Sequence, residues 1–413
     1  MLGICAALPL LCVFADPSVL ADPAATVTAS AFPIPGKVGV GADPATGQSR
    51  AVRVNHGALI HTGQLFPAGP QFSPTSPHDQ VLQVFAELQI ALQRANANLG
   101  DVVKLNVYVA HPSLTALIDQ QLKRSFSTGV PPAVSWVQTA MAESATMVAL
   151  DAVARVDVAA AKTVTLVDAD HSRGYARAAI LPQGPTAYIS GQAEAGDRTV
   201  KEATRQTMAS LLRTLEFLKT SSDQVVQVKA FLTPISDARI ALQEIQAAFA
   251  GKPCPPVTFV EWDSQLPIEI EMIAATPVPP ADSDRSLPPA VSYLTPPGMT
   301  TPTVYCRVAQ THSPARIYTG GLMAQTAEPN TEAEAVELFE ALKDVIDDAG
   351  GDLLHLVKGT YYVSHPEANR WITAVRPRYF QPSAPPAASK ANVAGTGRPP
   401  RQLTLDMIAV PKS

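Results

Sequence analysis

Three acidic residues in apolar stretches are the best candidates for chemistry in this sequence. Asp151, Glu271 and Asp406 each lie near the end of one of three similar stretches of the chain. The hydroxyl residues that precede them are Ser135, Thr258 and Ser389. In one interpretation the carboxylates serve a hydrolase. In the alternative they are structural, and backbone N–H groups cap their oxygens.

A basic segment precedes the last of these acids. Lys390, Arg398 and Arg401 lie on a stretch with glycine and proline just before Asp406. These cations either recognise an anionic group or are solvated surface charges, and the sequence leaves both interpretations open.

Other constellations with known chemistry are absent from the sequence. The eight histidines show neither His-x-x-x-His nor His-Glu-x-x-His spacing, so no metal site is expected. There is no Gly-x-Ser-x-Gly nucleophile elbow and no glycine-rich phosphate loop, so no cofactor is expected. Cys254 and Cys306 are the two cysteines outside the N-terminal segment, and the sequence does not determine whether they pair.

The elements that must position these residues occur three times. An apolar stripe with steps of four, three, four and three residues keeps to one side of a helix. Its three occurrences are Val81, Phe85, Leu88, Leu92 and Ala95; Thr204, Met208, Leu211, Leu215 and Leu218; and Ala335, Phe339, Leu342, Ile346 and Ala349. A strand, a second helix and a closing strand follow in the same register each time. A repeat of this length indicates duplicated domains rather than a solenoid.

Each repeat is expected to fold as β-β-α-β-α-β. Two short strands precede the first helix, and the acidic residue lies on the closing strand. The pattern predicts an α+β layer with helices on one face of each sheet. The other face of each sheet then needs a cover.

Length and composition agree with three globular domains. A chain of 413 residues is long enough for about three domains, and its apolar fraction of 46% is ordinary for a globular protein. The net charge of −5 argues against nucleic acid as a partner, because phosphate binding needs a cationic surface. No apolar run of 18 residues follows the start, so no membrane-spanning helix is expected. A small molecule is the expected partner.

The N-terminal segment resembles a signal peptide. A short apolar run, Leu2 to Ala15, is followed by Val19-Leu20-Ala21, where small residues suit a signal peptidase. We therefore expect an exported protein, periplasmic or secreted, with a cytoplasmic protein as the alternative. The expected segments are a signal peptide (1–21), a linker (22–45), domain one (46–160), domain two (161–280), a Pro-rich linker (281–291) and domain three (292–413).

Several short motifs stand at defined places in the repeats. They are Thr62-Gly63-Gln64 and Ser190-Gly191-Gln192 at strand ends, Asp101-Val102-Val103-Lys104 opening a middle strand, and Pro131-Pro132-Ala133 before a closing strand. These motifs resemble those of the Rid family, also called YjgF-like, RidA-like or endoribonuclease L-PSP. The resemblance covers nearly all of residues 46–413. It implies a chorismate-mutase-like fold and a trimer with clefts between neighbouring subunits. Three copies in one chain then imply an intramolecular pseudo-trimer that is a monomer in solution.

The resemblance also implies a set of cleft residues. In family enzymes an arginine binds the carboxylate of an imino acid, and an acidic residue positions the water that hydrolyses it. The acidic residue is retained in all three copies, but the arginine position holds Val134, Val257 and Ala388. The implied cleft residues are Thr62, Gly63, Val134, Ser135, Ser190, Gly191, Val257, Thr258, Thr319, Gly320, Ala388 and Ser389, with Arg398 and Arg401 as candidates from the third copy.

An aliphatic side chain cannot replace a bidentate Arg–carboxylate contact. A carboxylate left in an apolar cleft without a cation should also have a raised pKa. The sequence therefore predicts a small-molecule binding protein that lacks the family's 2-imino acid deaminase activity. An imine or enamine deaminase-type hydrolase with altered substrate, and a non-catalytic structural or interaction protein, remain the alternatives.

Overall fold

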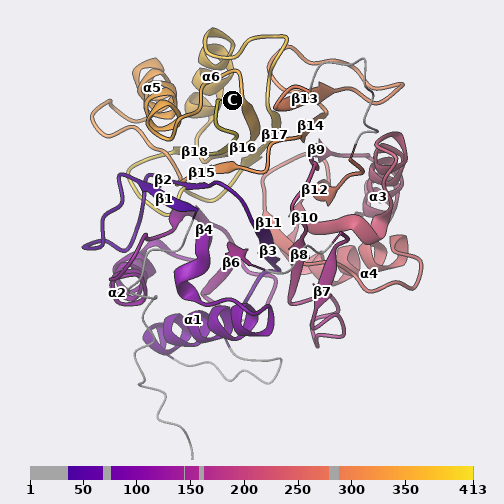
Figure 1. Ribbon diagram of the computed structural model, residues 1–413, viewed down its shortest axis with the longest axis horizontal. Coiled ribbons are helices and arrows are strands. Elements are labelled where there is room, and N and C mark those ends of the chain that lie inside the picture. Colours follow the sequence, from indigo (N-terminus) through magenta and orange to yellow (C-terminus); the bar gives the residue numbers. More distant parts are fainter. Residues whose placement is uncertain (1–35, 68–75, 144, 158–161, 279–287, 413) are drawn as a thin grey trace, which may run out of the picture.

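A computed structural model of the chain describes residues 36–67, 76–143, 145–157, 162–278 and 288–412. The expected signal peptide, residues 1–21, lies outside the described residues. Each copy supplies two helices, and Figure 1 shows them at the periphery of the molecule. They are α1 (Pro77–Arg94) and α2 (Thr115–Ser125), α3 (Val200–Phe217) and α4 (Ala238–Ala248), and α5 (Glu332–Asp348) and α6 (Pro366–Val375).

The first helix of each copy begins in the same way. Ser76, Thr199 and Thr331 precede α1, α3 and α5, and each side chain accepts a hydrogen bond from the backbone N–H three residues on. Such caps satisfy donors that have no partner within the helix. The predicted apolar stripes are buried in all three helices. The helical part of the repeat is confirmed.

The strands form three six-stranded mixed sheets. Sheet one runs β5 (Ala133–Gln138), β4 (Val102–Val109), β6 (Val148–Val156), β3 (Ala58–Thr62), β8 (Ala178–Leu181), β7 (Thr165–Val167). Sheet two runs β11 (Val257–Glu261), β10 (Val225–Leu232), β12 (Ile268–Ala275), β9 (Thr186–Gln192), β14 (Val308–Thr311), β13 (Val291–Leu294). Sheet three runs β17 (Ala387–Asn392), β16 (Leu356–Val363), β18 (Leu403–Ala409), β15 (Arg316–Thr319), β2 (Ala51–Val54), β1 (Lys37–Val40).

The leading hairpin of each copy completes the sheet of another copy. The β7–β8 hairpin of copy two joins sheet one, and the β13–β14 hairpin of copy three joins sheet two. The β1–β2 hairpin of copy one pairs with β15 and closes the ring. Only residues 55–57 separate β2 from β3, yet the two strands lie in different sheets. The helix–strand–helix unit of each copy is as expected, but each copy has a third strand before its first helix and a second strand after its second helix. The exchange of hairpins was also not expected.

The linker expected over residues 22–45 contains a strand, because residues 37–40 form β1. The exchange of hairpins also means that main-chain hydrogen bonds join the three copies. Each helix pair packs on its own sheet to give one of three separate apolar cores.

A fourth core fills the centre of the molecule. It combines side chains of all three sheets, including Val103, Tyr188 and Val357. The free sheet faces therefore bury against one another about a pseudo-threefold axis, as expected for an intramolecular pseudo-trimer (Figure 1). None of the helices in the described residues is long and apolar enough to cross a bilayer.

Candidate functional site

Three interfaces join the copies with related geometry. In each, a strand end donates a backbone hydrogen bond to the carbonyl of an arginine that precedes a strand of the next hairpin. The pairs are Gly63 with Arg177 (2.9 Å), Ser190 with Arg307 (3.0 Å) and Gly320 with Arg50 (2.7 Å). We number each interface by its two copies, with the copy that supplies the strand end first. They are interfaces 1–2, 2–3 and 3–1.

This pairing corrects the register of the second copy. The sequence aligned Ser190-Gly191 with Thr62-Gly63, but Ser190 occupies the place of Gly63 and Gly320. The motif of copy two is therefore offset by one residue. The next residues along the strand ends, Gln64, Gly191 and Gly321, face the neighbouring copy.

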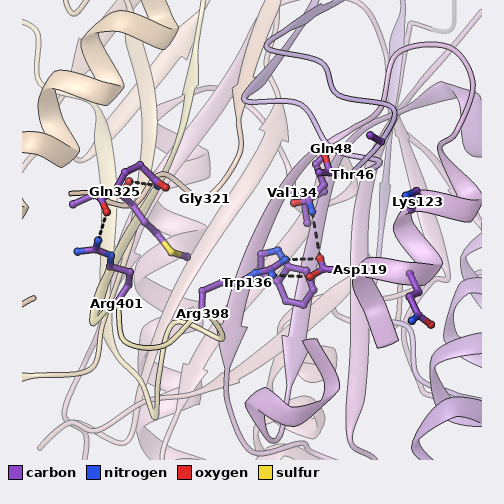
Figure 2. Close-up of a pocket in the computed structure, with 14 residues that line it drawn as sticks. Thr46, Gln48, Asp119, Lys123, Val134, Trp136, Gly321, Gln325, Arg398 and Arg401 are labelled. Carbon is purple, nitrogen blue, oxygen red and sulfur yellow. Dashed lines mark hydrogen bonds and ion pairs between the residues drawn. The ribbon is translucent and has the colours of Figure 1, made fainter. Parts of the chain in front are cut away.

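Interface 3–1 carries a pocket of about 590 Å³. Its walls come from the β1–β2 loop, α2 and β5 of copy one and from two loops of copy three (Figure 2). The residues labelled there are Thr46, Gln48, Asp119, Lys123, Val134, Trp136, Gly321, Gln325, Arg398 and Arg401. Three further pockets in the described residues have neither Val257 nor Ala388 in their walls.

Arg398 brings an arginine side chain to this pocket. Its guanidinium lies over the Trp136 ring, 4.0 Å from the centroid, close to the wall that Val134 forms. It donates two hydrogen bonds to the Asp119 carboxylate, at 2.8 and 2.6 Å. The pocket therefore holds an arginine, but that arginine already binds a carboxylate of the protein.

Arg401 has a different part in the same pocket. It donates to the carbonyl oxygens of Ala327 and Gln325, both at 2.5 Å. The Glu337 carboxylate accepts hydrogen bonds from the backbone N–H groups of Gln325, Thr326 and Ala327. These hydrogen bonds lower the pKa of Glu337 to about 2. Arg401 and Glu337 together hold the loop that forms one wall.

The acid of interface 3–1 lies behind the pocket in a buried polar cluster. Lys104 lies 3.4 Å from the Asp406 carboxylate and donates to Ser135 Oγ (2.5 Å) and to the Thr319 carbonyl (2.8 Å). Burial lowers the pKa of Lys104, and the nearby Asp406 opposes that shift. The expectation that this acid has no cation beside it is wrong.

Interface 2–3 repeats the cluster and adds a second carboxylate. Lys358 lies 2.7 Å from Glu271, and Ser389 donates to the same Glu271 oxygen. Glu269, which is only partly exposed, lies against Gly191, where a Cβ would come within 2.0 Å of its carboxylate. Burial and then the neighbouring Glu271 raise the pKa of Glu269 to about 7.

At interface 1–2, Gln227 stands at the position that a lysine occupies at the other two interfaces. Asp151 instead accepts hydrogen bonds from Asn106 (2.6 Å), Tyr108 (2.6 Å) and Thr258 (3.1 Å). Burial and the Asp151 carboxylate raise the pKa of Tyr108. The structural interpretation of the acids assumed backbone caps, whereas the caps seen here are side chains.

Two side chains also fill interface 1–2. Gln64 bonds both the N–H and the carbonyl of Phe259, each at 3.1 Å, while its own N–H bonds the Val257 carbonyl. The Tyr175 ring packs against Gly63, and its hydroxyl donates to the Gln64 carbonyl at 2.9 Å. At interface 3–1 the position of Gln64 is held by Gly321, which has no side chain to place in the pocket.

The predicted cleft residues therefore meet in three sets. Thr62 and Gly63 lie with Val257 and Thr258, Ser190 and Gly191 with Ala388 and Ser389, and Thr319 and Gly320 with Val134 and Ser135. The sequence alone did not indicate the pairing of Lys104 and Lys358 with acids or the contacts of Asp119 and Trp136 with Arg398. Recurrence of a lysine at the opening of the middle strand was the available signal for the first of these.

The described residues contain neither a disulfide between the two described cysteines nor a cluster that could hold a metal ion. Cys254 and Cys306 are free, buried thiols, and burial raises the pKa of each to about 12. In the described part of the chain, no three His, Cys, Asp or Glu residues gather where they could hold a metal ion.

Comparison with known proteins agrees with this architecture. The family model described as endoribonuclease L-PSP matches residues 41–156 and 168–276. The chain belongs to the endoribonuclease L-PSP family. The third copy lies outside these matches and is recognised by its sheet, which has the same arrangement of strands as the sheets of the other two copies. None of the curated proteins matches the chain.

Solved structures similar to this chain include single-copy members of the family. A conserved Rid family protein from Yersinia pestis is 28% identical, and the match covers 27% of this chain and 89% of that protein, with a TM-score of 0.25. A YjgF/YER057c/UK114 family member from Mycobacterium tuberculosis is 28% identical over the same shares, with a TM-score of 0.22. A putative endoribonuclease from Thermotoga maritima is 22% identical over 24% of this chain and 80% of that protein, with a TM-score of 0.22.

Proposed function

We propose that this protein binds a small molecule at interface 3–1 and lacks the 2-imino acid deaminase activity associated with its family. The observation that carries the proposal is the contrast between the interfaces. Interface 3–1 has a pocket lined by Val134, whereas Gln64 and Tyr175 fill interface 1–2 and Glu269 lies against Gly191 at interface 2–3.

Two further observations support the absence of imine hydrolysis. The arginine position holds an aliphatic residue in every copy, and Asp119 already binds the nearby Arg398. Asp406 is paired with Lys104 behind the pocket. A carboxylate so paired is a poor general base, because the lysine stabilises its ionised form.

A thermal-shift screen of small acids and amines tests the binding proposal. We expect at least one compound to raise the melting temperature, because a ligand of the native state alone stabilises it by mass action. The same compound should not stabilise Gly321→Gln, whose new side chain enters the pocket wall. Equal stabilisation of both proteins would move the site elsewhere.

An activity assay tests the second part. Hydrolysis of 2-iminobutanoate should be negligible, and a rate typical of family deaminases would contradict the proposal. A hydrolase with altered substrate is the second candidate, since Lys123 and Arg398 in the pocket favour an anionic substrate. Turnover of a compound found in the screen would support it.

We also propose that the mature protein is an exported monomer. The apolar segment Leu2 to Ala15 and the sequence Val19-Leu20-Ala21 support cleavage after Ala21, and the closed ring of sheets supports a monomer. Mass spectrometry of native material with residues 1–21 intact would contradict export. Light scattering that gives three chains per particle would contradict the monomer.

A further inference from the structure

An ion pair across the pocket of interface 3–1 has the two-bond geometry with which an arginine binds the carboxylate of a ligand. Asp119 on α2 and Arg398 on the loop before β18 make two parallel hydrogen bonds, and both side chains line the pocket (Figure 2). The two side chains are partly exposed, at 38% and 29%. A partly exposed ion pair contributes little to stability, so a competing carboxylate can open it.

The charges around this pair favour an anion. Lys123, Arg398 and Arg401 line the pocket, and Asp119 is the one acidic residue in its walls. The Arg401 guanidinium is bound to two carbonyl groups, and Lys123 lacks a planar fork of donors. Arg398 is thus the lining cation whose geometry suits a carboxylate.

We propose that Arg398 is the carboxylate-binding group of this pocket and that Asp119 occupies it until a ligand displaces it. The proposal rests on the proposed function, because it assigns a ligand class to the same pocket. The ligand is a small organic acid with an apolar body. Its carboxylate takes the two bonds that Asp119 gives up, and its body contacts Val134 and Met323.

The surroundings make the exchange feasible. Trp136 supports the guanidinium from one face, so Arg398 keeps its position when Asp119 leaves. Asp119 and Lys123 are four residues apart on α2, a spacing that brings side chains together on a helix. The displaced carboxylate therefore has a second cation within reach.

Titration of the full chain with benzoate and, separately, with inorganic phosphate tests the proposal. Asp119→Asn removes the internal competitor, so benzoate should bind about threefold to tenfold more tightly than to the wild type. Arg398→Gln should weaken benzoate at least about tenfold, and Arg398→Lys should weaken it less because it keeps the charge but loses the fork. The double variant Asp119→Asn with Arg398→Gln should show no gain over Arg398→Gln.

Asp347→Asn is the matched control. Asp347 is an exposed acid of α5 that pairs with Lys412, so its loss changes the net charge equally without touching the pocket. It should leave benzoate affinity unchanged. Melting curves of each variant show whether the fold is retained, and Asp119→Asn supplies a gain of binding that unfolding cannot produce.

The outcomes separate this proposal from the proposed function. Wild-type binding of benzoate that Asp119→Asn does not strengthen, but that Gly321→Gln abolishes, would overturn the role of Arg398 and leave the pocket as the binding site. A gain for phosphate alone would replace the carboxylate class with phosphate. No binding of benzoate or phosphate by the wild type or Asp119→Asn would overturn the role of Arg398, whereas the proposed function would fail only if the thermal-shift screen also found no ligand.

Discussion

Interfaces 3–1 and 1–2 are built from the same elements, but one contains a pocket and the other is filled. The residue after the shared strand-end hydrogen bond is Gly321 in the first and Gln64 in the second. At interface 3–1 only the backbone of that residue reaches the next copy, by the 2.9 Å bond to Val134. At interface 1–2 the Gln64 side chain adds two bonds to Phe259.

The buried acids differ in a parallel way. Asp406 has Lys104 beside it, whereas Asp151 has neutral donors and Gln227 stands at the lysine position. Copies joined in one chain can therefore diverge at single positions while the fold stays the same.

The largest expected effect comes from making the charge at interface 3–1 resemble that at interface 1–2. Lys104→Gln leaves the buried Asp406 without its adjacent cation, which should cost about 3–5 kcal/mol of unfolding free energy. Urea denaturation measures the loss. Gln227→Lys is the reverse change, and it should not restore stability to Lys104→Gln. A loss below about 1 kcal/mol would show that Lys104 does not compensate Asp406.

Gly321→Gln should close the pocket. A Cβ at this position would lie 3.0 Å from Thr404 Oγ1 and 3.3 Å from Ser135 Oγ, so the change should cost about 1–3 kcal/mol through overpacking. Ligand binding should fall at least about tenfold, measured by calorimetry with a compound from the screen. Retained affinity in a folded variant would mean that the pocket is not the site.

Gln64→Ala tests the filled interface. It leaves the buried N–H and carbonyl of Phe259 without partners, at a cost of about 1–3 kcal/mol for an unsatisfied group. We expect a lower urea midpoint and no change in ligand affinity at interface 3–1. Tighter or weaker binding there would show that the two interfaces are coupled.

The last expected effect is a change in the pH dependence of stability at interface 2–3, rather than a loss at a single pH. The pKa of Glu269 is raised to about 7, so the folded state holds this proton more tightly than the unfolded state. Stability from this group is full below the ordinary glutamate pKa of about 4.5 and is lost as the pH rises through about 7. Glu269→Gln should flatten the stability profile in that window, and an unchanged profile would contradict the shift.

The sequence predicted the features that depend on local periodicity. The apolar stripes of α1, α3 and α5 and the order of elements recur in register, and the cover of the free sheet faces follows from their need for burial. The exchange of hairpins could not be predicted, because β2 pairs equally well in principle with a strand of either copy. The one-residue offset of Ser190 could not be seen in the sequence, because Ser190-Gly191-Gln192 resembles Thr62-Gly63-Gln64. The register is set instead by the main-chain hydrogen bond from Ser190 to Arg307.

The site was predictable only in part. Val134, Arg398 and Arg401 line one pocket, although the sequence offered the two arginines only as replacements within the third copy. The bond between Asp119 and Arg398 joins residues 279 positions apart, and nothing in either local sequence indicates it. The filling of interface 1–2 likewise depends on Tyr175, which enters from the hairpin of another copy.

A crystal structure with the compound that stabilises the protein most in the thermal-shift screen tests the central claim directly. The account predicts one ligand per chain, at interface 3–1 between Val134, Gly321 and Arg398, with the Gln64–Phe259 bonds intact at interface 1–2. Ligand at interface 1–2, or equal occupancy of all three interfaces, would contradict it.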